Sequence, residues 1–295
     1  MAQTWTCSGL RWAAQGPALV WDGGRRSALP WGKRVAFAVP EGAVRTCVGA
    51  RGYACPLRSP VSARSTGARC EECARLDRAH SVAADTLADD PRPYRVYLAW
   101  FGPGLVKVGI TAVERGPTRL LEQGAVCFSW LGTGPLMAAR RTEELLRAAL
   151  RVPDRIPYAQ KRAVRSALPA TAAERAAEVR ELHARAVALD GRPESLRPQP
   201  CRVVDHTGAF GLAGAVPATG EVVELAPGGA VGGELVAAAG PDLHLAVEGR
   251  GVVVLDTRLM RGWELVPSAA AEAGDPAGEL TFALRPFVRE QDGLF

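Results

Sequence analysis

Apolar and polar residues alternate most clearly over Tyr94–Thr111, YRVYLAWFGPGLVKVGIT. Two apolar runs flank Gly102-Pro103-Gly104, a pattern that predicts a β-hairpin with a three-residue loop. This loop length places Tyr97 opposite Gly109. Since side chains alternate along a strand, one face is predicted to be core and carries Val96, Leu98, Trp100, Val106, Val108 and Ile110. The other face carries Tyr97 and Lys107, and Gly109 is expected to leave open space opposite the tyrosine ring.

This polar face of the hairpin has two interpretations. A half-buried antiparallel sheet often presents one polar face to solvent, so Tyr97 and Lys107 could simply be solvated. A tyrosine, a lysine and a glycine gap on one surface are also typical of a binding site. The hairpin alone does not decide between them.

Shorter elements follow the hairpin. Pro117 suits the first position of a helix and Gly124 its end, which places Arg119 in the first turn, and residues 126–131 are predicted to be a third strand. Later in the chain, Thr171 and Glu174 have the spacing of a capping box. They predict a helix that ends near residue 190, with His183 on its surface.

The run of residues 136–151 predicts a longer helix of strong propensity, and its spacing separates two adjacent acids. Glu143 shares a helix face with three apolar residues, Ala139, Leu146 and Leu150. Glu144 shares a face with two cations, which predicts surface ion pairs with Arg140 and Arg147. A carboxylate on an apolar face is costly unless it has a partner or a metal ion. Glu143 is therefore the candidate functional acid.

The predicted elements give an α+β fold with four segments. Residues 1–46 form an N-terminal β segment, 47–80 a zinc-ribbon-like cysteine segment, and 93–190 a central domain with a small mixed sheet and a following helix. Residues 201–295 are predicted to be an all-β module, with glycine-punctuated strands at 210–216, 221–225, 243–247 and 252–255. Neither β part looks complete alone, so this module is expected to pack with residues 1–46.

Four of the seven cysteines gather in one segment with the spacing C-x7-C-x14-C-x2-C, namely Cys47, Cys55, Cys70 and Cys73. A C-x2-C pair lets two thiolates bind one tetrahedral metal ion, although the first gap is wider than usual. Residues between the cysteines offer little apolar material, so a metal would explain how the segment folds. The sequence predicts a structural zinc site, and four cysteine ligands leave no open position for catalysis.

The composition excludes some classes of protein and charge suggests a partner. The chain has 295 residues, 47% hydrophobic and 23% charged, and no apolar run approaches the roughly 20 residues that cross a bilayer. The N-terminus lacks the features of a signal peptide, so a cytoplasmic protein without a membrane partner is expected. Residues 92–165 contain 13 basic and 5 acidic residues. This imbalance favours a polyanionic partner such as nucleic acid, or else an ordinary solvated arginine surface.

The central region resembles the GIY-YIG nuclease superfamily, with the triplets Val96-Tyr97-Leu98 and Lys107-Val108-Gly109. The resemblance implies that Tyr97 assists nucleophile activation, that Arg119, with Arg115 as the alternative, stabilises phosphate charge, and that Glu143 holds Mg²⁺ or Mn²⁺. Lys107 stands where the superfamily usually has its second tyrosine, and it would also offset phosphate charge. Gly109, Thr111 and Arg115 would contact the substrate.

The whole chain is similar to a bacterial family known as domain of unknown function 2797. Three stretches carry the similarity: the cysteine segment ending at Cys73, the run from Lys107 to Ala125, and Val252–Thr257. The family implies an architecture but no activity.

Together these features predict a nucleic-acid-binding protein, with divalent-metal-dependent phosphodiesterase activity as the stronger form of the hypothesis. The alternative is a catalytically inactive module that contains zinc and binds nucleic acid or a protein. The sequence leaves the oligomeric state and the substrate open.

Overall fold

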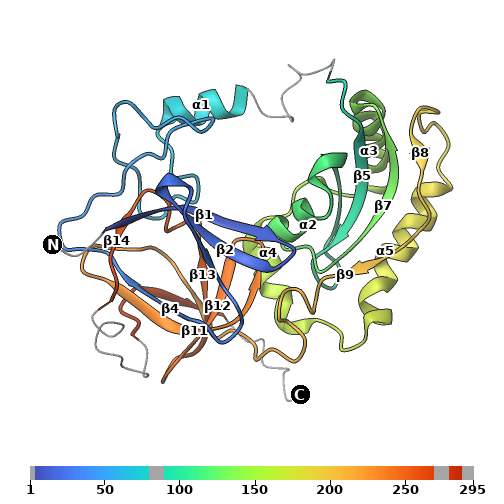
Figure 1. Ribbon diagram of the computed structural model, residues 1–295. Coiled ribbons are helices and arrows are strands. Elements are labelled where there is room, and N and C mark those ends of the chain that lie inside the picture. The colour runs from blue at the N-terminus through green and yellow to red at the C-terminus, as the bar shows by residue number, and fades with distance from the viewer. Residues whose placement is uncertain (1–3, 80–89, 269–278, 288–295) are drawn as a thin grey trace. The chain divides into compact units, whose positions relative to one another are not determined.

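The chain forms two units, one made of residues 1–79 together with 215–295 and the other of residues 80–214. The structure, a computed structural model, describes residues 4–79, 90–268 and 279–287 (Figure 1). Strands in several sheets and a smaller number of helices make up both units, which confirms the α+β class.

The hairpin at the start of the central unit has the predicted register. Strands β5 (Tyr94–Trp100) and β6 (Val106–Ala112) are antiparallel, and Tyr97 pairs with Gly109. The N–H of Phe101 donates to the carbonyl of Leu105 at 2.9 Å and closes the glycine-proline-glycine loop.

The third strand, β7 (Cys127–Gly134), pairs with the free edge of β5 and confirms the strand expected at 126–131. Two short strands, β8 (Arg197–Pro198) and β9 (Val204–Asp205), then pair with β7. Residues up to 214 therefore belong to the central unit.

One face of this sheet is covered by two helices, α3 (Leu136–Leu150) and α5 (Ala172–Val187). In Figure 1, α2 and α5 lie on opposite sides of β5 and β7. The predicted core residues of the hairpin all pack here, with Val179, Leu182 and Ala186 of α5. Glu178 of α5 accepts hydrogen bonds from Trp100 Nε1 at 3.0 Å and from the N–H of Gly104 at 3.1 Å. The helix is thus fixed to the loop of the hairpin.

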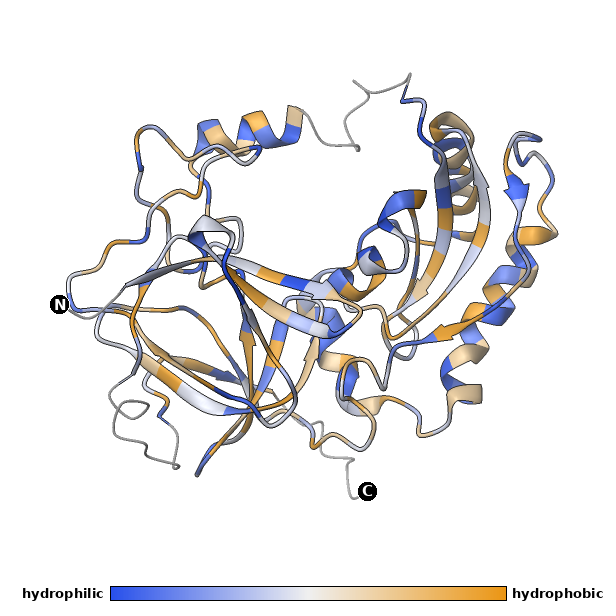
Figure 2. Cartoon of the chain, viewed as in Figure 1, coloured by the Kyte–Doolittle hydropathy of each residue, from blue (hydrophilic) through white to orange (hydrophobic). Residues whose placement is uncertain are grey.

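Helix α5 begins at the predicted capping box, in which Thr171 and Glu174 exchange hydrogen bonds. The expectation that His183 lies on the surface is wrong, because this side chain is buried. His183 follows Val179 by four residues and so shares its inward face. Figure 2 shows hydrophobic and hydrophilic residues following each other along α5, as expected of a helix with one buried face.

The opposite face of the sheet is also covered, so the interpretation of Tyr97 and Lys107 as simply solvated is wrong. A second apolar cluster contains Tyr97, Ala99, Phe101, Leu120, Ala125 and Phe128. Helix α2 (Thr118–Gln123) provides Leu120 and ends at Gly124, which has a left-handed conformation. Helix α4 (Tyr158–Val164), which the proline-interrupted sequence did not predict, places the Lys161 ammonium 3.9 Å from the ring centre of Phe101.

The other unit contains two sheets. The first has the order β14-β1-β2-β3 and the second the order β15-β10-β13-β12-β11-β4. The strands of the first are β1 (Trp5–Ala13), β2 (Gly16–Trp21), β3 (Arg26–Ala28) and β14 (Glu264–Leu265). The strands of the second are β4 (Arg34–Ala38), β10 (Gly220–Val222), β11 (Ala230–Ala239), β12 (Asp242–Val247), β13 (Gly251–Asp256) and β15 (Leu284–Pro286).

The longest strand of this unit, β11, was not predicted, and a predicted one is absent. β11 pairs with β4 and brings Ala230 opposite Ala38, so strands from both ends of the chain share one sheet. No strand forms over residues 210–216, which make turns. Gly211 and Gly214 have positive φ values of 66° and 68°, a conformation that interrupts a strand.

Arg45 joins the cysteine segment to the turn between β13 and β14 of the same unit. Its side chain is 2% exposed and donates to five backbone carbonyls, those of Ser62, Ala63, Ser65, Arg258 and Arg261. A buried guanidinium without a carboxylate is stable only when its donors are satisfied in this way.

Candidate functional site

The four clustered cysteines come together as their spacing predicts. The Sγ atoms of Cys47, Cys55, Cys70 and Cys73 all lie within 4.8 Å of one another. Sulfur atoms bound tetrahedrally to one zinc ion are separated by about 3.8 Å, given a Zn–S distance of about 2.3 Å. The cluster could therefore hold a metal ion such as zinc with small side-chain shifts.

Backbone turns position the first thiol of the cluster. The N–H groups of Gly49 and Cys70 lie 3.3 and 3.2 Å from Cys47 Sγ. Gly49 has a φ of 80°, and a Cβ at this position would overlap the carbonyl of Tyr53. The turn that directs a donor to the sulfur thus requires glycine, which explains how the wide first gap still yields a ligand.

The remaining thiols differ in acidity. Backbone N–H groups of Ser59 and Leu57 lower the pKa of Cys55 to about 6, whereas burial raises the pKa of Cys73 to about 12. Cys73 lies in the first turn of α1 (Glu71–Ala79), where the helix dipole favours a thiolate. Thiolates packed this closely repel one another, and a bound cation would let all four thiols ionise.

The covered face of the hairpin is a second candidate site. Tyr97 is 2% exposed, and its hydroxyl accepts a hydrogen bond from Gln123 Nε2 at 2.8 Å. The ring fills the space above Gly109, where a Cβ would overlap the phenol. Gly109 therefore makes room for the tyrosine itself, and the open gap expected from the sequence does not exist.

Lys107 and Lys161 are two buried lysines at this face of the sheet. Lys107 Nζ lies 5.6 Å from the ring centre of Tyr97 and donates to the carbonyl of Asp154 at 3.0 Å. Lys161 Nζ donates to the carbonyl of Gln123 at 3.0 Å. Burial lowers the pKa of Lys107 to about 8, and the positive charge of Arg119 adds to this effect.

The four residues expected to act together influence one another electrostatically. Burial raises the pKa of Tyr97, while Arg119 opposes this effect and Glu143 adds to it. Burial also raises the pKa of Glu143; the charge of Asp154 adds to this effect, and that of Lys107 opposes it. Arg119 and Glu143 thus each lie within electrostatic range of Tyr97 and of Lys107.

The expected substrate-contact residues are placed less uniformly. Arg115 forms an ion pair with Glu122 and also lowers the pKa of Tyr97. Thr111 is buried, and its Oγ1 lies 3.5 Å from the carbonyl of Ala112.

Glu144 is exposed, whereas Arg147, its expected partner, lies 3.7 Å from Asp154.

Sequence reasoning missed three residues of this face, namely Gln123, Asp154 and Lys161. A signal for Lys161 was present, because the chain has only three lysines, Lys33, Lys107 and Lys161, against many arginines. Two of the three lysines lie at this face. Asp154 offered no such signal, since it stands in an irregular segment that the hairpin approaches only in three dimensions.

Comparison with known proteins identifies a family but no close relative. The family model described as "Protein of unknown function (DUF2797)" matches residues 34–265. No curated protein and no solved structure matches the sequence significantly. Within the described ranges, no helix combines the length and apolar character needed to cross a membrane.

Proposed function

The chain belongs to the DUF2797 family, and we propose that its central unit binds and hydrolyses a phosphodiester of a nucleic acid. One observation carries this proposal: Lys107 Nζ lies 5.6 Å from the ring centre of Tyr97, and the charges of Arg119 and Glu143 act on both of these side chains. The similarity of Val96–Leu98 and Lys107–Gly109 to the two triplets of the GIY-YIG nucleases supports it.

In this proposal the cations bind the phosphate. Arg119 provides a planar fork of N–H donors suited to phosphate oxygens, and Lys107 adds a point charge beside it. Residues 92–165, with 13 basic and 5 acidic residues, attract the polyanion and make its binding dependent on salt. Tyr97, held by Gln123, orients the attacking water.

Glu143 and Asp154 would hold the divalent cation. Two nearby carboxylates repel each other, and the charge of Asp154 accordingly raises the pKa of Glu143. A cation relieves this repulsion, and Mg²⁺ is commonly bound by one or two carboxylates together with substrate phosphates. When bound, Mg²⁺ or Mn²⁺ would offset phosphate charge and lower the pKa of a coordinated water.

The four-cysteine cluster has a structural part in the proposed function. We assign zinc to it, because four thiolates complete a tetrahedral shell and leave no coordination position for a substrate. In this assignment zinc stabilises the fold of residues 47–79 and takes no part in hydrolysis.

A second function, binding without hydrolysis, is favoured by one specific observation. Tyr97 is 2% exposed and its hydroxyl is already hydrogen-bonded to Gln123, so a substrate reaches this oxygen only if neighbouring groups move. Lys107 also occupies the position of the second tyrosine of the nucleases. Both features suit a module that holds phosphate without cleaving it.

Cleavage of branched and single-stranded DNA and RNA with Mg²⁺ or Mn²⁺ separates the two functions. Glu143→Gln is expected to abolish cleavage, while Glu144→Gln, at the exposed neighbouring position, retains it. Arg119→Ala is expected to weaken binding more than tenfold, and Arg141→Ala, which removes an exposed arginine of α3, changes it less than threefold.

The outcomes are distinct. Salt-dependent binding without cleavage, weakened by Arg119→Ala, establishes the second function and rejects hydrolysis. Absence of binding to every nucleic acid at low salt rejects both. Equal cleavage by wild type and Glu143→Gln rejects the catalytic assignment even if the protein is a nuclease.

A further inference from the structure

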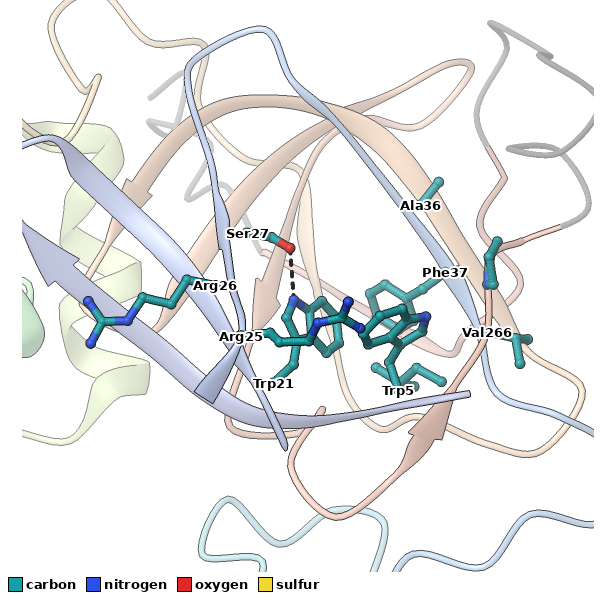
Figure 3. A pocket seen from close by; sticks show the side chains of 10 residues that line it. Trp5, Trp21, Arg25, Arg26, Ser27, Ala36, Phe37 and Val266 are labelled. Carbon is teal, nitrogen blue, oxygen red and sulfur yellow. Dashed lines mark hydrogen bonds between the residues drawn. The ribbon is translucent and has the colours of Figure 1, made fainter. Parts of the chain in front are cut away.

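A cavity of about 400 Å³ opens in the unit formed by residues 1–79 and 215–295, outside the sites described so far. It lies between β1, β2, β3, β4 and the segment after β14 (Figure 3). Aromatic and aliphatic side chains form most of its wall, namely Trp5, Trp21, Ala36, Phe37, Leu265, Val266 and Pro267. Cavities of this size typically hold a small molecule or one residue of a polymer.

Trp5 and Trp21 provide the indole rings of the cavity, and Arg25 covers one face of Trp5. The indoles of Trp5 and Trp21 meet edge to face, with centroids 6.4 Å apart and planes inclined by 61°. Both tryptophans are only half-buried. Figure 3 shows the side chain of Arg25 between the two indoles, and its guanidinium carbon lies 4.6 Å from the ring centre of Trp5.

The polar side chains that line the cavity are those of Arg25, Arg26 and Ser27. Arg25 forms no ion pair within the described residues, and no acidic residue lines the cavity. Trp21 Nε1 donates to Ser27 Oγ at 2.8 Å, which leaves the Ser27 hydroxyl proton free to donate to a ligand. Arg26 also borders the cavity, but it alternates with Ser27 along β3 and is exposed, and its side chain extends away from the indoles in Figure 3.

These features define the chemistry of the ligand. A cationic ligand is disfavoured because Arg25 already occupies the face of Trp5 with a positive charge and no carboxylate offsets it. An anionic ligand is favoured because it can form an ion pair with the guanidinium of Arg25. A planar aromatic body gains stacking on indole and guanidinium surfaces, which is how nucleobases bind to proteins that hold single strands.

We propose that this cavity binds one nucleotide, with its base against Trp5 and Trp21 and its phosphate on Arg25. Ser27 then donates to an acceptor atom of the base. The nucleotide comes either from a free mononucleotide or from an unpaired position of a nucleic-acid strand, since both present the same base and phosphate. This inference does not rest on the function proposed for the central unit, because different residues carry it.

Isothermal titration of the full-length protein with AMP, UMP, adenosine and the oligomers rA8 and rU8 tests the proposal. Binding of a nucleotide is expected, with adenosine at least tenfold weaker than AMP because it lacks the phosphate. Arg25→Ala is expected to weaken binding at least tenfold, whereas the matched variant Arg26→Ala changes it less than twofold. Trp5→Leu, which keeps the cavity apolar but removes the π surface, is expected to weaken binding similarly to Arg25→Ala.

The arms of the experiment also identify the source of the nucleotide. If the oligomers bind more tightly per site than AMP or UMP, the natural ligand is a strand. If AMP binds as tightly as the oligomers, the natural ligand is a free nucleotide. No heat of binding for any of these ligands at millimolar concentration overturns the proposal, as does equal loss in the Arg25 and Arg26 variants. Arg25-dependent binding of a fatty acid without nucleotide binding also overturns it. Because cleavage is assayed through Arg119 and Glu143, failure here leaves the function proposed for the central unit unaffected.

Discussion

The four-cysteine cluster and the charged face of the hairpin are assembled in contrasting ways. Three of the cysteines lie in irregular segments and Cys73 in the first turn of α1, and the apolar residues packed against them are few and small, such as Ala50 and Val61. Tyr97 and Lys107 lie on strands with an apolar cluster on each side of the sheet. In the first arrangement the proposed metal ion would determine the shape of the segment, whereas the second is shaped by packing and buries its charged groups at a free-energy cost.

Loss of the metal at the cysteine cluster should give the largest effect. Cys73→Ser, or a strong chelator, is expected to lower the Tm of the unit by about 10 °C or more, because metal binding supplies the folding free energy of a segment without a core. Amides of residues 47–79 should lose protection from hydrogen exchange first.

Cys201→Ser is the control for this prediction, since Cys201 is exposed and outside the cluster. Protein purified under reducing conditions should contain one zinc ion per chain by mass spectrometry. Zinc-free protein with the same Tm and exchange would contradict the contrast drawn between the two regions.

The charge of Lys107 should give the next largest effect. Its pKa is lowered by burial to about 8, so between pH 8 and about 10.4, the ordinary pKa of lysine, the unfolded chain binds more protons than the folded one. The free energy of unfolding therefore rises with pH across this window, by about 3 kcal/mol in total.

Urea unfolding of wild type and Lys107→Met at pH 7.5, 9 and 10.5 measures this effect. The variant lacks the titrating group, so it should be more stable than wild type at pH 7.5. This difference in unfolding free energy should shrink as the pH rises. A constant difference between the two proteins would show that Lys107 is charged normally in the fold.

Gly109→Ala tests whether packing shapes the charged face. The new Cβ would overlap the phenol of Tyr97, and displacement of that ring is expected to cost about 1–3 kcal/mol in unfolding free energy. Gly208→Ala is a matched control, because a Cβ there has open space around it. In a Tyr97→Ala background the Gly109 substitution should cost much less, and an unchanged cost would contradict the contact.

Glu143→Gln should have the smallest effect on stability. Burial raises the pKa of Glu143, so the charged carboxylate is disfavoured in the fold. The stabilising contribution of the protonated carboxyl is present at low pH and is lost as pH rises through the raised pKa. At pH 7 the variant should be as stable as wild type or more stable by less than about 1 kcal/mol. Urea unfolding beside Glu144→Gln checks this, and a marked loss of stability would show that the carboxylate supports the fold.

The predictions that succeeded depended on short-range rules. Loop length sets the register that pairs Tyr97 with Gly109, and residue spacing identifies the capping box at Thr171 and the close approach of the four cysteines. Each rule concerns either neighbouring residues along the chain or the spacing of residues that can bind one metal ion. Such rules can be applied to the sequence directly.

The predictions that failed required knowledge of what packs on a surface. Gly109 was expected to leave open space beside Tyr97, and the sequence did not reveal that helix α4 covers this face, because the helix is short and follows two prolines, Pro153 and Pro157. Lys161 buries its stem while its ammonium contacts an aromatic ring and a carbonyl, a role that its residue type does not predict. β11 was missed because six of its ten residues are glycine or alanine, which are uncommon in strands.

The division of one unit between the two ends of the chain determines the order in which the protein can fold during synthesis. The central residues 80–214 are complete before β11 leaves the ribosome, so they can fold on the nascent chain while β4 has no partner. Arg45 must also wait for the carbonyls of Arg258 and Arg261. A chain cut after residue 214 should therefore retain a folded centre and an unpaired, protease-sensitive N-terminal arm.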